Sequence, residues 1–262
     1  MLHEVTLMTP PSGEDWRRSL LDRPRVVTFI KFVMRHSPFG GVYRRVETSA
    51  PVVALTYDDG PNPPYTQEVL DVLDHYQVNA TFFMIGRHIE AHPDTARAVL
   101  LRGHGAGNHS YWHPVLLLRT PSFVRSQIAA TDTLLRRMGA TGEIYFRSPY
   151  GVHFFAVPFV LARQKRKNIL FDVTGHDWFV DDPACIAQQV LESVQPGSII
   201  LLHDGGGPRR GTAVATARII EQLGSRGYTC VSLSELFALA CGGGSGRGSK
   251  PTTPMARPAQ AS

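Results

Sequence analysis

The sequence predicts an α/β protein with a parallel sheet that closes into a barrel, and two patterns carry this prediction. Short apolar, β-branched runs alternate with longer segments whose apolar residues recur at helical spacing. They make about seven strand–helix units, which is typical of a parallel sheet covered by helices. The candidate reactive side chains lie at or just past the C-terminal ends of predicted strands, where βα barrels gather their active sites. A chain of 262 residues, 43% of them hydrophobic, suits one large domain.

The predicted elements follow one another along the chain. Strands are expected at 52–57, 80–85, 104–108, 143–147, 168–173, 198–202 and 228–233. Helices are expected at 65–76, 88–102, 121–138, 154–166, 183–194 and 212–225. The helix at 65–76 has a clear apolar stripe, whereas Pro158 makes the helix at 154–166 irregular.

The charge of the chain is concentrated in its two ends. Residues 16–46 carry eight basic residues and one acid, and residues 242–262 carry three basic residues and no acid. Residues 47–241 carry 16 basic and 18 acidic residues, so the central body is mildly acidic, which argues against nucleic-acid binding. We therefore predict a basic N-terminal extension at 1–46, a catalytic domain at 47–241 and a disordered tail at 242–262 that is rich in Gly, Ser, Pro and Thr.

The N-terminal extension contains a predicted amphipathic helix at 23–35. Its apolar face consists of Val26, Phe29, Ile30 and Val33. Docking of this face on the body is the simpler interpretation, and weak membrane-surface contact through residues 16–46 is the alternative. The first residues lack the pattern of a signal peptide, and no apolar run is long enough to span a bilayer. We therefore expect a cytoplasmic protein, and peripheral attachment to a membrane is the alternative.

Two adjacent carboxylates, Asp58 and Asp59, follow the first predicted strand and precede a Gly-Pro-Asn turn. Adjacent residues of a strand point to opposite sides. One carboxylate can therefore hold a metal ion while its neighbour faces a water or a substrate. An ordinary turn is the alternative interpretation, because Asp, Gly and Pro are common turn residues.

His109 and His113 are spaced four residues apart, which on a helical turn places both imidazoles on one face. With Asp59 they make a set of two nitrogens and one oxygen that leaves a position open for water, as in catalytic zinc sites. Fe(II) and other divalent ions accept the same set. A structural or solvated histidine pair is the alternative.

The remaining candidates supply proton transfer and its support. Asp58 is the candidate base for a metal-bound water, and Arg147 could pair with it and hold it in place. His203 ends a strongly apolar strand and titrates near neutrality, so it can act as a general acid. Asp177 could orient either His203 or Arg147, and Trp178 could form one wall of an apolar pocket.

Five segments of the chain resemble, in order, the motifs of a known enzyme family. They are Thr56-Tyr-Asp-Asp-Gly-Pro61, His109-Ser-Tyr-Trp-His-Pro114, Arg147-Ser-Pro-Tyr150, Asp177-Trp178 and Leu201-Leu-His203. The family is the polysaccharide deacetylases with the NodB homology domain, carbohydrate esterase family 4, and the likeness extends from residue 52 to about residue 236. This resemblance implies a distorted (β/α) barrel with its active site at the C-terminal ends of the strands.

The resemblance also implies an activity. The family removes acetyl groups from carbohydrate with the help of a metal ion, so we expect hydrolysis of N-acetyl amides in an amino-sugar oligo- or polysaccharide of the chitin-oligosaccharide or peptidoglycan type. An O-acetyl esterase acting on a polysaccharide such as xylan, and a sugar-binding module without catalysis, are the alternatives.

The roles of individual residues carry over from the family by position. Asp58 would be the base, His203 the acid and Arg147 the group that orients Asp58. One divalent ion, expected to be zinc with cobalt or another ion as alternatives, would be bound by Asp59, His109 and His113.

The resemblance further implies an oxyanion donor and a pocket for the acetyl methyl group. The backbone N–H of Tyr150 would be the donor, and Leu201 with Trp178 would surround the methyl. The family often has an acid three residues before Asp177, where this chain has Thr174. The acid that supports Arg147 is therefore open between Asp177 and Asp172.

Overall fold

The computed structural model describes residues 41–242. The predicted helix at 23–35 and residues 243–262 of the predicted tail lie outside the described residues. The strands are β1 (Val42–Tyr43), β2 (Val52–Asp58), β3 (Thr81–Met84), β4 (Gly105–Asn108), β5 (Tyr145–Phe146), β6 (Asn168–Ile169), β7 (Val173–Thr174), β8 (Ile199–His203) and β9 (Thr229–Val231). The α-helices are α3 (Tyr65–Tyr76), α4 (Gly86–Ala91), α5 (Pro93–Leu101), α6 (Pro121–Met138), α7 (Ala156–Arg163), α8 (Pro183–Ser193), α9 (Arg210–Ser225) and α10 (Leu233–Gly242).

The strands form a parallel sheet that closes on itself, as the predicted barrel requires. The strand order is β1-β6-β5-β4-β3-β2-β8-β7, and β9 also pairs with β2. β6 and β7 belong to one continuous segment, 168–174, and β6 pairs with β5 while β7 pairs with β8. This segment therefore joins the two edges of the sheet. The fold class predicted from the sequence is confirmed as a distorted (β/α) barrel.

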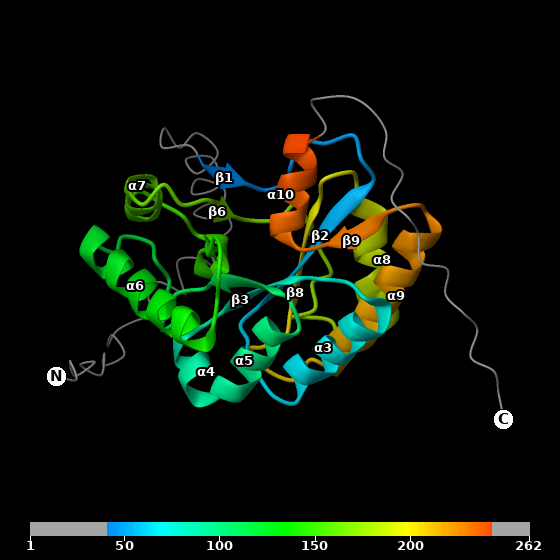
Figure 1. Cartoon of the computed structure of the whole chain (residues 1–262), viewed down its shortest axis with the longest axis horizontal. Helices are drawn as coiled ribbons and strands as arrows, with labels where there is room; N and C mark the ends of the chain where they lie inside the picture. Colours follow the sequence, from blue (N-terminus) through cyan, green and yellow to red (C-terminus); the bar gives the residue numbers. More distant parts are fainter. Residues whose placement is uncertain (1–40, 243–262) are drawn as a thin grey trace.

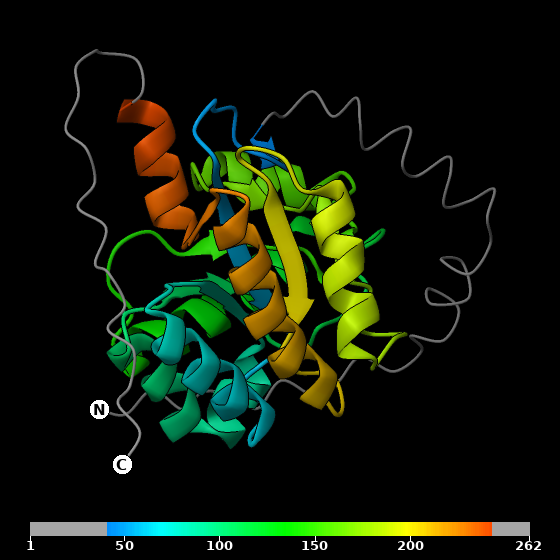
Figure 2. The same cartoon turned by 90° about the vertical axis from the view of Figure 1, so that its right-hand side faces the viewer.

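The helices cover the outside of the barrel (Figure 1). Figure 2 shows β8 running between α8 and α9, with α10 near the end at which β8 begins. Leu233 and Leu236 of α10 are buried in the same cluster as Val52 of β2 and Ile199 of β8. α10 therefore covers the N-terminal end of the barrel and leaves the opposite end for the site.

Four local predictions were wrong. The strand expected at 168–173 is two short strands, because the chain pairs with β5 at β6 and then with β8 at β7. The helix expected at 88–102 is α4 and α5, since Pro93 offers no backbone N–H and starts a new helix. β1 lies inside the predicted N-terminal extension, and the sheet thus begins before residue 47. α10 was not predicted: only its first residue, Leu233, was included, as the end of the strand expected at 228–233.

β2 is buried on both faces, and its alternation positions the first site residue. Its odd-numbered residues, Val53, Leu55 and Tyr57, pack in the cluster beneath the surrounding helices. Val52 and Ala54 point into the barrel interior instead. Period-two alternation continues this inner face through Thr56 to Asp58. The carboxylate of Asp58 thus lies above an apolar layer inside the barrel.

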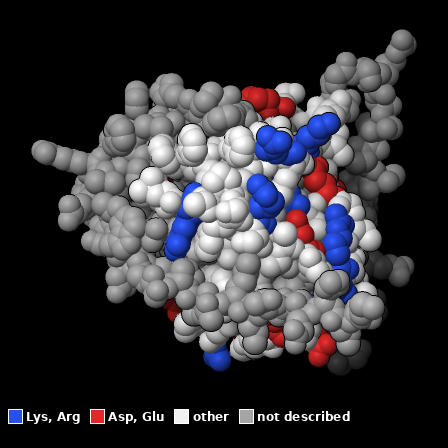
Figure 3. All heavy atoms as spheres, turned by 90° about the vertical axis from the view of Figure 1, so that its left-hand side faces the viewer, with Lys and Arg blue, Asp and Glu red and all other residues white. Residues whose placement is uncertain are grey.

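The described surface carries charges of both signs (Figure 3). Several basic side chains lie beside acids, as in the ion pairs of Arg166 with Asp132 at 2.7 Å and of Lys167 with Glu143 at 2.7 Å. Within residues 41–242, no helix combines the length and apolar character needed to cross a bilayer. Cys185, Cys230 and Cys241 are free thiols.

We predict that Gly107→Ala destabilises the barrel. A Cβ at Gly107 would lie 2.3 Å from the ring of Phe83, so the ring would have to move. Overpacking of this kind costs about 1–3 kcal/mol, to be measured by urea denaturation. Gly224→Ala is the matched control, because Gly224 lies in α9 with nothing within 4 Å of an added Cβ. Its free energy of unfolding should stay equal or rise slightly. Equal stability of Gly107→Ala and wild type would refute the tight interior packing.

Candidate active site

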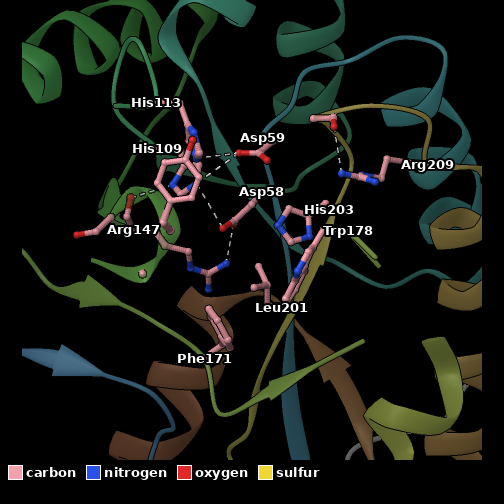
Figure 4. Close-up of a pocket in the computed structure, with 14 residues that line it drawn as sticks. Asp58, Asp59, His109, His113, Arg147, Phe171, Trp178, Leu201, His203 and Arg209 are labelled. Atoms are coloured by element: carbon pink, nitrogen blue, oxygen red, sulfur yellow. Dashed lines mark hydrogen bonds and ion pairs between the residues drawn. The ribbon is translucent and has the colours of Figure 1, made fainter. Parts of the chain in front are cut away.

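The C-terminal ends of the strands surround a cavity of ≈ 440 Å³ (Figure 4). It contains every side chain predicted for the site except Asp177, which lies directly behind His203. The predicted residues that line it are Asp58, Asp59, His109, His113, Arg147, Tyr150, Trp178, Leu201 and His203. Five segments far apart in the sequence thus meet in one place, and the volume suits a small-molecule site.

Arg147 and Asp58 form a buried ion pair at the centre of the site. Arg147 is 1% exposed, and its Nη1 donates to Asp58 Oδ1 at 2.6 Å and to Thr56 Oγ1 at 2.9 Å. The ring of Phe83 lies 4.1 Å from the guanidinium carbon. Asp58 Oδ2 remains directed toward His109, whose Nε2 is 3.5 Å away. The predicted pairing of Arg147 with Asp58 is present, and it leaves one carboxylate oxygen facing the cavity.

Asp58 and Asp59 face the same cavity, so the expectation that strand alternation separates them was wrong. Asp59 has a φ of 73°, which ends the strand and turns its carboxylate back toward the histidines. Asp59 Oδ1 lies 3.2 Å from His113 Nε2 and 3.5 Å from His109 Nε2. Left-handed φ values are uncommon for residues other than glycine and are concentrated at functional sites.

The two histidines do not lie on a helical turn as predicted. They lie on an irregular loop in which Ser110 and His113 both have positive φ. The loop nevertheless places the rings of His109 and His113 with centroids 4.8 Å apart. His109 Nδ1–H donates to the carbonyl of Arg147 at 2.8 Å, which leaves Nε2 with its lone pair toward Asp59.

The residues Asp59, His109 and His113 fit a divalent metal ion. One ligand atom from each lies within 4.8 Å of the others. Asp59 Oδ1 is buried without a hydrogen-bond partner, which is the state expected of an oxygen that binds a cation. Burial lowers the pKa of His109 to about 4 and that of His113 to about 3, so both imidazoles are neutral and able to ligate at neutral pH. Membership of a metal-dependent family would require such a site, and the donor set matches one.

His203 and Asp177 form the second ion pair of the cavity. His203 Nδ1–H donates to Asp177 Oδ1 at 2.8 Å, and the His203 backbone N–H donates to Asp177 Oδ2 at 2.7 Å. Thr212 Oγ1 also donates to Asp177 Oδ2 at 2.8 Å. Burial alone would lower the pKa of His203, but the hydrogen bond and charge of Asp177 outweigh it and raise the pKa.

Neither candidate acid supports Arg147. Asp177 is engaged by His203, and Asp172 accepts from Ser198 Oγ and from the Ile199 backbone N–H, both at 2.9 Å. Two backbone carbonyls, instead of an acid, accept the remaining hydrogen bonds of Arg147. Arg147 Nε donates to the carbonyl of Ile169 at 3.1 Å, and Nη2 donates to that of Leu170 at 3.2 Å.

Apolar and aromatic side chains form the walls. Leu201 is buried beside the cavity, and the ring of Trp178 lies 5.3 Å from that of His203. Tyr150 has a φ of 58° in the short turn η1 (Pro149–Gly151). Phe171 also lines the cavity and was not predicted, because it lies in the middle of the segment expected to be one strand.

Sequence reasoning missed three polar residues around the Asp58–Asp59 turn. His88 donates from Nδ1 to the carbonyl of Asp59 at 2.8 Å. Asp204 is buried beneath the same turn, where Thr66 Oγ1 donates to it at 2.6 Å and burial raises its pKa to about 7. Arg209 lines the cavity. The position of Asp204 directly after His203 was the one available signal; the other two contacts depend on the fold.

Comparisons with known proteins identify the family of this chain. Residues 45–165 match the family model for polysaccharide deacetylase. A chitooligosaccharide deacetylase of Sinorhizobium fredii is 37% identical over 202 residues, which cover 73% of this chain and 94% of that enzyme. A peptidoglycan-N-acetylglucosamine deacetylase of Bacillus cereus is 34% identical over 200 residues, 76% of this chain and 71% of that protein.

A solved structure gives the same result. The crystal structure of the Bc1960 peptidoglycan N-acetylglucosamine deacetylase, in complex with an N-hydroxybenzamide, matches with a TM-score of 0.73 and 32% identity, over 76% of this chain and 93% of that one. Because similarity at this level extends over 71% to 94% of the length of these relatives, the chain belongs to the polysaccharide deacetylases, carbohydrate esterase family 4, and is a carbohydrate deacetylase.

Proposed function

We propose that this enzyme hydrolyses the N-acetyl amide of an amino sugar within an oligo- or polysaccharide of the chitin-oligosaccharide or peptidoglycan type. One observation carries the proposal: a cavity holds a carboxylate fixed by an arginine, a metal-ligand set and a histidine fixed by a second carboxylate. These are the groups that amide hydrolysis needs. Their presence together favours an enzyme over a sugar-binding module without catalysis.

Each group has a place in the reaction. A divalent ion held by Asp59, His109 and His113, which we propose to be zinc, would supply Lewis-acid activation of the water and the acetyl carbonyl. Asp58 Oδ2 accepts a proton from the water as its oxygen bonds to the acetyl carbon. The backbone N–H of Tyr150 donates to the oxygen on which negative charge develops. His203 Nε2 gives its proton to the nitrogen as the C–N bond breaks, leaving acetate and the free amine.

The rim of the cavity supports a carbohydrate substrate. Trp178 lines the cavity, its ring lies 5.6 Å from that of Phe179, and Phe179 is 83% exposed. Tyr150 also lines the cavity and is 48% exposed. Rigid aromatic rings at the mouth of a polar site offer flat apolar surfaces on which the C–H faces of sugar rings can pack.

We expect acetate release from acetylated glycans that depends on a divalent ion. The purified enzyme should be incubated with chitin oligosaccharides, peptidoglycan fragments and acetylated xylan, each before and after removal of metal with a chelator. Release from the first two that is lost with chelator and restored by zinc supports the proposal. Release from xylan alone would replace it with an O-acetyl esterase, and metal-independent release would refute the metal site.

We predict that Asp58→Asn retains the metal and loses turnover. An amide is nearly isosteric with the carboxylate but cannot accept the proton of the water, so kcat should fall by at least about 10²-fold. The metal content of the variant is measured by elemental analysis. His113→Ala is the comparison variant, because it removes a ligand and should lose the metal itself. Near-normal kcat in metal-loaded Asp58→Asn would rule out Asp58 as the base.

We predict that Asp177→Asn moves the alkaline limb of the pH profile of kcat to lower pH. His203 must be protonated to act as the acid, so activity falls as the pH rises through its pKa. Asp177 raises that pKa, and without its charge the effect of burial, which lowers the pKa, prevails. Asp172→Asn is the control, since Asp172 bonds to Ser198 and Ile199 rather than to His203. An unshifted limb in Asp177→Asn would contradict the assigned role of the pair.

A further inference from the structure

The connection between β8 and α9 packs directly against the proposed metal ligand Asp59. A Cβ on Gly205 would lie 2.1 Å from the Asp59 carbonyl oxygen, and one on Gly206 would lie 2.9 Å from Asp59 Oδ2. The Gly205 backbone N–H also donates to the carbonyl of Asp58 at 3.2 Å. Only glycine allows this approach, so the loop backbone itself forms the support of the Asp58–Asp59 turn.

Arg209 holds this loop in place from within. Its side chain is 9% exposed, and Nε donates to the Gly205 carbonyl at 2.7 Å while Nη2 donates to the Gly206 carbonyl at 3.2 Å. Nη1 donates to the carbonyl of Pro208 at 3.3 Å. Among residues 41–242 no carboxylate lies within ion-pair distance of Arg209, so the guanidinium binds carbonyl groups instead of an acid. Its hydrogen bonds therefore fix backbone positions.

The same guanidinium reaches the other half of the site. Arg209 Nη1 donates to the carbonyl of Asp177 at 3.2 Å, and the Asp177 carboxylate holds both the ring and the backbone of His203. One planar, forked group thus connects the loop behind Asp59 with the residue that orients His203. Figure 4 shows Arg209 on the Asp59 side of the cavity.

We propose that Arg209 is a positioning residue that sets the location of the metal ligand Asp59 relative to the His203–Asp177 pair. This inference rests on the proposed metal site at Asp59, His109 and His113. A lysine keeps the charge but not the planar fork, so it cannot hold the same carbonyls together. Groups that orient metal ligands from behind change metal affinity by about 10–100-fold when they are substituted.

The test measures metal affinity rather than activity. Zinc is titrated into metal-free Arg209→Lys and wild-type protein in competition with a chelator, and the thermal unfolding of both metal-free proteins is recorded. We expect about 10–100-fold weaker zinc binding by the variant at a temperature where it is folded. Arg136→Lys is the matched control, because Arg136 also donates to two carbonyls, those of Ala140 and Gly142, far from the site. Its zinc affinity should equal that of wild type.

Two outcomes would overturn the inference. Wild-type zinc affinity in folded Arg209→Lys, with or without a lower Tm, makes Arg209 a structural residue only and leaves the metal site intact. Absence of zinc binding by the wild type removes the metal site and this inference with it. If Arg209→Lys fails to fold, amide hydrogen exchange of the wild-type protein is the test instead. If the loop fixes Asp59 for zinc binding, then zinc binding must in turn stabilise the loop, because such coupling acts in both directions. Zinc should slow exchange of the Gly205 amide, and unchanged exchange in a protein that binds zinc contradicts the coupling.

Discussion

The buried guanidinium of Arg147 is the constraint on which the rest of the structure depends. A charge with 1% exposure is costly unless it is paired and hydrogen-bonded. Arg147 meets this requirement with Asp58 and Thr56 of β2 and with the carbonyls of Ile169 and Leu170. Those two carbonyls lie in the segment that closes the barrel. Closure of the sheet and orientation of the proposed base are therefore accomplished by one side chain.

Two histidines of the cavity, His109 and His203, differ in the group that accepts a hydrogen bond from the Nδ1 of each ring. His109 Nδ1 is bound to a neutral carbonyl, and burial keeps the ring uncharged. His203 Nδ1 is bound to the carboxylate of Asp177, which raises its pKa against the effect of burial. A carbonyl thus lies behind the ring of the proposed metal ligand, and a carboxylate lies behind the ring of the proposed proton donor. The protein thus separates two functions of one residue type within a single cavity.

Backbone conformation, as well as side-chain identity, determines where the side chains of the site point. Asp59, His113 and Tyr150 all have positive φ, and each lines the cavity. Such conformations persist where surrounding contacts fix them. Around Asp59 these contacts are the His88 hydrogen bond and the glycine loop held by Arg209. The rigidity of the surrounding shell allows the ligand atoms to be in place before a metal ion or a substrate binds.

The sequence by itself determined most of the strands and helices and the motif residues that meet in the site. Hydrophobic periodicity predicted the bounds of α3 and α6, and the ordered motifs identified residues such as Asp59 and His203 that meet in the cavity. Only the tertiary structure decided that Asp177 supports His203 and not Arg147, that both carboxylates face one cavity, and that Arg209 connects the two halves of the site. Periodicity and motifs report local chain geometry and residue type. Contacts between distant segments, such as that of Thr66 with Asp204, 138 residues further along the chain, arise only once the barrel closes, and so do the left-handed turns that orient the ligand side chains.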